Sequence, residues 1–70
     1  MSDRELKQLG NRIREVRKKR GLTQLEVANL ADTSSNYFAE IERGQANPSY
    51  SMLTAIAKAL KVKLSDLIPS

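Results

Sequence analysis

Short hydrogen-bonding side chains are concentrated in one stretch of the sequence, residues 33–44, which reads TSSNYFAEIERG. Four small polar residues lead this stretch, and only Phe38 and Ile41 are clear core candidates. Hydroxyl and amide groups at the start of a helix cap its free amides, and they also bond base edges where a helix end enters a major groove. Asparagine pairs with two atoms of adenine, so Asn36 would discriminate between bases more than Ser35 would. Both interpretations, helix cap and base contact, stay open for these side chains.

The side chains that carry most metal and nucleophilic chemistry are missing. The sequence has no cysteine and no histidine, so it predicts no disulfide and no structural zinc site. Its carboxylates show none of the paired, buried spacing that acid–base catalysis requires. We therefore expect a protein that is not an enzyme and that uses no cofactor, metal or small-molecule ligand.

Positive charge is concentrated at the N-terminal end of the chain. Residues 1–20 carry eight basic and three acidic side chains, a net charge of +5, whereas residues 21–70 carry four basic and five acidic ones, a net charge of −1. A polyanionic partner would explain this asymmetry, and so would a helix face kept soluble by lysine and arginine. An anionic membrane surface is the weaker interpretation, because the narrow apolar stripe of the basic segment is needed to pack the bundle.

The length of the chain predicts one domain, residues 1–70. A domain of this size buries only about 60% of its unfolded surface, so tight helix packing or a partner subunit must stabilise it. The N-terminus lacks the apolar core of a signal peptide, and no stretch approaches the roughly 18 apolar residues that span a bilayer. We therefore expect a soluble, cytoplasmic protein.

Apolar periodicity predicts an all-α bundle of five short helices. The first runs from Asp3 to Arg20, and a capping box at residues 23–26 starts the second. The third occupies the polar-led stretch, Ser49 caps the fourth, and residues 62–68 form a short fifth helix that Pro69 ends. The core residues predicted from helical spacing are Leu6, Leu9, Ile13, Val16, Val27, Ala28, Ala31, Phe38, Ile41, Met52, Leu53, Ile56, Ala57 and Leu60.

The connection Asp32–Thr33 is too short for the second and third helices to lie antiparallel with a long overlap. The two helices must therefore cross steeply, which is the helix-turn-helix arrangement. In that arrangement the second helix of the pair presents its N-terminal residues outward, toward a major groove about 12 Å wide. The small polar side chains at the front of residues 33–44 suit this position.

Four motifs in register show a family resemblance: LTQLEVA at 22–28, IERG at 41–44, NPS at 47–49 and LTAIAKALKVKLSDLI at 53–68. Over residues 13–68 the chain resembles the Cro/C1-type, or Xre, helix-turn-helix domains. This resemblance implies a five-helix fold, sequence-specific binding of a double-stranded DNA operator as a homodimer, and transcriptional control. Because the domain fills the chain, it resembles small stand-alone regulators, such as restriction-modification controller proteins, more than full-length phage repressors.

The resemblance also implies roles for individual side chains. Gln24 would contact a phosphate and brace the third helix, and Arg17 and Glu42 would form a buried ion pair between the first and third helices. Leu64, Leu67 and Ile68 are expected at the dimer interface, because so small a chain needs further burial. The expected DNA-binding residues are Thr23, Gln24, Ser34, Ser35, Asn36, Tyr37, Glu40, Arg43, Gln45 and Asn47.

Three positions depart from the usual family pattern: Asp32 and Lys61 stand where glycine is common, and Thr33 stands where a small apolar residue is common. We expect these departures to lower stability and leave the fold intact. Glu40 could accept a hydrogen bond from a cytosine amine or repel phosphate.

Alternatives remain for two other DNA-binding candidates and for the function itself. Tyr37 could contact a phosphate or only pack on the surface, and Asn47 could contact the DNA backbone or only shape the turn before Pro48. The alternative functions are a helical protein-interaction module that uses the same fold, and an antitoxin. A preference for particular duplexes would distinguish DNA binding from docking.

Overall fold

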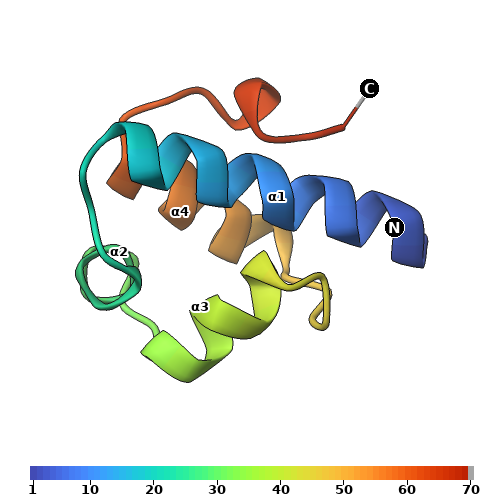
Figure 1. Cartoon of the computed structure of the whole chain (residues 1–70), viewed down its shortest axis with the longest axis horizontal. Helices are drawn as coiled ribbons and strands as arrows, with labels where there is room; N and C mark the ends of the chain where they lie inside the picture. The colour runs from blue at the N-terminus through green and yellow to red at the C-terminus, as the bar shows by residue number, and fades with distance from the viewer. Residues whose placement is uncertain (70) are drawn as a thin grey trace.

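The computed structural model of the chain describes residues 1–69. These residues form four α-helices and one 3-10 turn, without a β-strand, so the all-α fold class is confirmed (Figure 1). None of the described helices is long and apolar enough to cross a lipid bilayer. The elements are α1 (Asp3–Lys19), α2 (Gln24–Leu30), α3 (Ser35–Glu42), α4 (Tyr50–Leu60) and η1 (Leu64–Asp66).

The expected fifth helix at residues 62–68 is wrong, because this segment contains only the single turn η1. Pro69 follows closely, has no amide hydrogen to continue a helix, and disfavours helical geometry in the residue before it. The backbone amide of Lys63 donates to the Asp66 carboxylate at 3.0 Å. This side-chain bond satisfies the first free amide of the turn.

Each α-helix begins at a hydroxyl side chain that accepts a hydrogen bond from a backbone amide three residues later. Such caps satisfy amides that have no partner inside the helix. In α1 and α2 a glutamate completes a capping box, and the bond from the Ser2 amide lowers the pKa of the Glu5 carboxyl. The four capping residues are Ser2, Thr23, Ser34 and Ser49.

Each α-helix also ends in the same way, at a residue in the left-handed conformation with φ between 57° and 74°. The next amide along the chain then donates to the carbonyl five residues before it, at 2.9–3.2 Å, which is the Schellman motif. Glycine occupies this position after α1 and α3, but not after α2 and α4. The four left-handed residues are Gly21, Asp32, Gly44 and Lys61.

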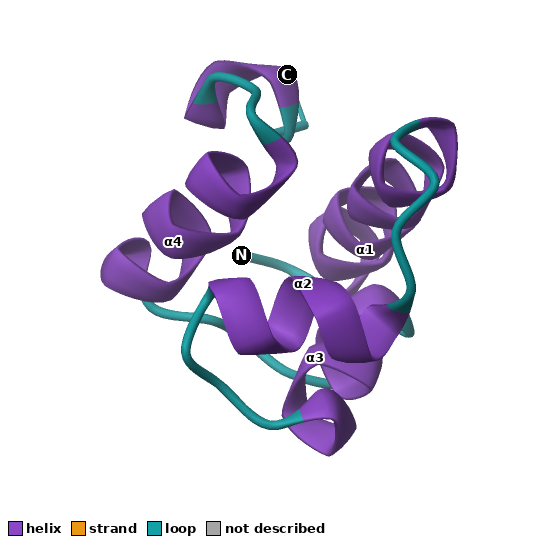
Figure 2. Ribbon diagram, turned by 90° about the vertical axis from the view of Figure 1, so that its left-hand side faces the viewer, coloured by secondary structure: helices purple, strands orange, loops and turns teal. Residues whose placement is uncertain are grey.

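The helices pack in two levels. In both views α1 and α4 lie above α2 and α3 (Figures 1 and 2). Figure 1 looks along α2 while α3 lies across the view, so the two helices cross steeply, as expected. The helix α1 contacts α3, and α2 contacts both α3 and α4. All the predicted core residues are buried in this arrangement except Met52, which is half-buried.

Leu67 is a further core residue, with none of its surface exposed. The expectation that it contacts a second subunit is therefore wrong, because its side chain fills the gap between η1 and the rest of the subunit's own core. Leu64 and Ile68 pack against the same core but stay partly exposed. Only these two of the three expected dimer residues are accessible.

Candidate nucleic-acid interface

The helix α3 has a buried face and an exposed polar face. Its buried residues are Phe38, Ile41 and Glu42. Asn36, Glu40 and Arg43, at spacing i, i+4 and i+7, are exposed. Because this spacing places side chains on one side of a helix, the three form a single polar stripe along α3.

At the start of α3, one polar residue caps the helix and a neighbouring one faces solvent. The Ser34 hydroxyl accepts a hydrogen bond from the Tyr37 amide at 3.1 Å, so Ser34 is the cap. Within residues 1–69, the side chains of Ser35 and Asn36 form no hydrogen bond to the protein, and that of Asn36 is exposed. The capping interpretation therefore holds for Ser34, whereas the amide of Asn36 is available to a partner.

The remaining candidates in α3 and the loop after it differ in their surroundings. Tyr37 is half-buried and packs against the core. Arg43 donates from Nε to the Gln45 Oε1 at 2.9 Å, which holds both exposed side chains beside the end of α3. Asn47 is exposed in the following loop, next to the buried Pro48.

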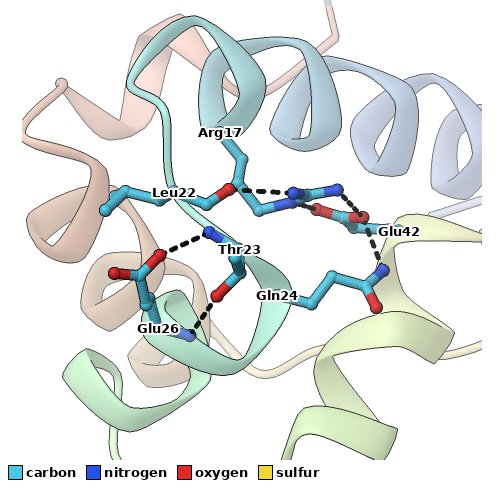
Figure 3. A network of polar contacts seen from close by, with 6 residues as sticks. All are labelled: Arg17, Leu22, Thr23, Gln24, Glu26 and Glu42. Atoms are coloured by element: carbon cyan, nitrogen blue, oxygen red, sulfur yellow. Dashed lines mark hydrogen bonds and ion pairs between the residues drawn. The ribbon is translucent and has the colours of Figure 1, made fainter.

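A buried ion pair fixes the inner side of α3 (Figure 3). Arg17 Nε donates to Glu42 Oε2 at 2.6 Å, and its Nη2 donates to Oε1 at 3.1 Å. This bidentate geometry is the strongest arrangement for such a pair, and the two residues are only 8% and 5% exposed. The expected ion pair is therefore present, and it explains why an acidic residue of α3 does not face outward.

The same network connects α2 to α3. Gln24 Nε2 donates to Glu42 Oε1 at 2.9 Å, and Arg17 Nη1 donates to the Leu22 carbonyl at 2.9 Å (Figure 3). Thr23 and Glu26 close the capping box beside it, with bonds of 2.8 and 3.1 Å. Gln24 thus braces α3 as expected. The contact of Gln24 with a phosphate stays a prediction.

The sequence analysis did not single out a group on α1, because it weighed the basic residues of that segment only together, as a site for a polyanion or as a solvated face. Lys7, Asn11 and Arg14 line one groove together with Gln24, Arg43 and Gln45. The signal that could have found them is their spacing of i, i+4 and i+7, the same as in the polar stripe of α3. Their nearness to α3 could not be inferred from that spacing.

The family described as "Helix-turn-helix domain" matches residues 10–69 of this chain. The chain belongs to this helix-turn-helix family. The resemblance to Cro/C1-type regulators inferred from the four motifs is thereby confirmed, although the expected number of helices is not.

Relatives of this helix-turn-helix domain are named as regulators. The chain is 45% identical over 60 residues to the immunity repressor protein of Bacillus phage phi105, a match that covers 86% of this chain and 42% of that protein. It is 42% identical over 60 residues to the transcriptional regulator ClgR of Mycobacterium tuberculosis, covering 86% of this chain and 54% of that protein. The chain thus spans about half the length of these curated relatives.

A solved structure matches the helix-turn-helix domain over nearly its full length. The restriction-modification controller protein C.AhdI from Aeromonas hydrophila has a TM-score of 0.91 and 34% identity, covering 93% of this chain and 98% of that one. The domain therefore has a structural relative of its own size. These names agree with the DNA-binding regulator that the sequence predicts.

Proposed function

We propose that this protein is a cytoplasmic transcriptional regulator that binds a double-stranded DNA operator as a homodimer, with α3 in the major groove. The proposal rests on the difference between the two faces of α3. Its inner face is held by the buried Arg17–Glu42 pair, whereas Asn36 projects from its outer face with a free amide. The regulator names of the relatives support a role that is not enzymatic.

Side chains at the start of α3 contact bases, and side chains in the segments that flank α3 contact the DNA backbone. Asn36 pairs with adenine N6 and N7, and Ser35 supplies a hydroxyl at the tip of the helix. Thr23, Gln24, Arg43, Gln45 and Asn47 lie in the segments that flank α3, and we assign them to the sugar-phosphate backbone. Backbone contacts set the position of the helix, and base contacts set the sequence preference.

Glu40 lies one turn after Asn36 on the same stripe. Its carboxylate cannot favour phosphate, so it weakens binding to DNA in general. Where it meets a cytosine amine it accepts a hydrogen bond. We infer that Glu40 raises selectivity at a cost in non-specific affinity.

A second copy of the chain covers the surface beside η1. The apolar atoms of Ala55, Val62 and Leu64 line a shallow depression on the outer side of α4, and Ile68 is partly exposed nearby in the chain. We infer that twofold pairing through this surface brings two copies of α3 to successive major grooves, which lie about 34 Å apart. An operator with twofold character follows from that symmetry.

The experiment that tests the proposal is selection of bound sequences from random duplex DNA, followed by binding titrations of the selected duplex and its single-base variants. Asn36→Ala is expected to lower discrimination among the variants by about 1–3 kcal/mol at one position, because the bidentate contact is lost. Its binding to a random duplex should keep the same salt dependence. Asn29→Ala, an identical change on the exposed surface of α2, is the matched control and should leave both quantities unchanged.

Two results would contradict this assignment in different ways. If selection enriches no sequence, the protein is not a sequence-specific regulator, and the docking-module alternative gains support. If Asn36→Ala weakens selected and random duplexes equally, DNA binding stands but Asn36 contacts no base.

A further inference from the structure

The groove between α1 and the end of α3 has a volume of about 460 Å³. Three of the residues that line it come from α1, and three come from the segments that the proposed function assigns to the DNA backbone. These six are Lys7, Asn11, Arg14, Gln24, Arg43 and Gln45.

The groove is electropositive. Lys7, Arg14 and Arg43 each contribute one positive charge. Glu42 also lines the groove, but its two oxygens accept the bonds from Arg17 and Gln24, so its charge is neutralised inside the protein. The three cations therefore face an anion from solution without a competing carboxylate.

Two glycines bring α1 close enough to build this groove. A Cβ atom on Gly10 would lie 2.4 Å from the Glu42 carbonyl oxygen, and one on Gly44 would lie 2.7 Å from Lys7 Cγ. Any larger side chain at either position would separate α1 from the end of α3. The close approach places the stem of Lys7 against Gly44, the residue that follows Arg43.

Arg43 belongs both to this groove and to the exposed stripe of α3, so the two surfaces are continuous. An anion in the groove would thus lie next to DNA held by α3. A small organic ligand fits less well, because pockets for such ligands are lined mainly by hydrophobic and aromatic side chains, whereas this lining is charged and polar.

We propose that Lys7 and Arg14, with Asn11 between them, form a subsite on α1 for backbone phosphates of duplex DNA. This inference rests on the proposed function and extends the DNA contact surface from the helix-turn-helix to α1. Lys7 and Arg14 lie about 10 Å apart along the helix, so each can contact a different phosphate. They add affinity without sequence preference.

The test is the dependence of affinity on salt concentration for a random duplex. Each phosphate contact that is lost lowers the slope of log K against log salt by about 1, so Lys7→Ala/Arg14→Ala should lower it by about 2. Lys19→Ala/Lys63→Ala removes the same charge from exposed positions outside the groove, and it should leave the slope close to that of the wild type. Arg14→Lys keeps the charge and should retain the wild-type slope.

The outcomes separate this inference from the proposed function. If the wild-type protein binds no duplex, both are overturned. If the wild type binds with a salt-dependent affinity and the two double variants have the same slope, the α1 subsite alone is overturned. Circular dichroism of each variant checks that the helices are intact, and alanine at the exposed positions in α1 favours helix.

Discussion

At the scale of single residues, burial and bonding partners divide the polar side chains of α3 by role. Glu42 is 5% exposed and engages Arg17 and Gln24, whereas Asn36 is exposed and bonds to no described protein group. Both are polar residues on one short helix, and composition does not distinguish them. Loss of a bonding partner of Glu42 should therefore lower the stability of the fold, whereas substitution of Asn36 should impair DNA recognition.

Arg17→Ala should lower the free energy of unfolding by about 3–5 kcal/mol, because it leaves the Glu42 carboxylate buried without a counter-charge. Glu15→Ala is the control: it breaks the surface pair of Arg12 and Glu15, whose side chains are 45% and 62% exposed, and should cost less than about 1 kcal/mol. Denaturant unfolding measures both. The double variant Arg17→Met/Glu42→Leu should recover much of the loss, since no charge stays buried. Equal effects of Arg17→Ala and Glu15→Ala would show that the buried pair does not stabilise the fold.

At the scale of elements, all four α-helices begin with a hydroxyl cap and end at a left-handed residue. These signals are local, so helix starts and ends could be predicted from a few adjacent residues, as at Thr23 and Gly21. The exceptions are Asp32 and Lys61, which adopt φ values of 57° and 59° that normally favour glycine. The predicted loss of stability at these departures from the family pattern thus has a conformational cause.

Lys61→Gly should raise the stability of the domain by about 0.5–1 kcal/mol, because relief of the left-handed strain exceeds the added entropy of the unfolded chain. Asp32→Gly should give a smaller gain, since aspartate tolerates this conformation better. Gly21→Ala should have the opposite effect, a loss of about 1 kcal/mol. Beyond its two chain neighbours, no described atom lies within 4 Å of a Cβ at Gly21, so that loss is conformational. Thermal unfolding is the measurement, and a lower melting temperature for Lys61→Gly would contradict the explanation.

At the scale of the whole molecule, η1 and α3 lie at opposite ends of the vertical axis that Figures 1 and 2 share. Pairing of two subunits through the segment around η1 would leave the exposed face of α3 uncovered. A domain of this size has little core to spare, and Leu67, the residue after η1, is buried in the core of its own subunit. The proposed dimer interface therefore uses the partly exposed Leu64 and Ile68 on either side of Leu67.

Leu64→Glu should convert the dimer to a monomer with little change in helix content, because it places a charge on a partly exposed side chain at the proposed interface. Leu67→Ala should instead lower the free energy of unfolding by about 2–5 kcal/mol, since it opens a cavity in the core. Sedimentation at tens of micromolar protein measures the first effect and denaturant unfolding the second. A wild-type protein that sediments as a monomer under these conditions would refute the proposed dimer.

The sequence by itself determined the all-α class, the four α-helices, the buried stripe of each and the Arg17–Glu42 pair implied by the family motifs. The helices and their buried stripes could be predicted because caps, left-handed ends and apolar periodicity act over a few neighbouring residues. The Arg17–Glu42 pair joins residues far apart in the sequence and followed from the family resemblance alone. Only the tertiary structure decided that residues 62–68 form one 3-10 turn with Leu67 inside the core, and that Lys7 and Arg14 lie beside Arg43. These features depend on how closely segments distant in the sequence approach, and that distance is set by packing. For α1 and the end of α3, the close approach requires that Gly10 has no Cβ atom.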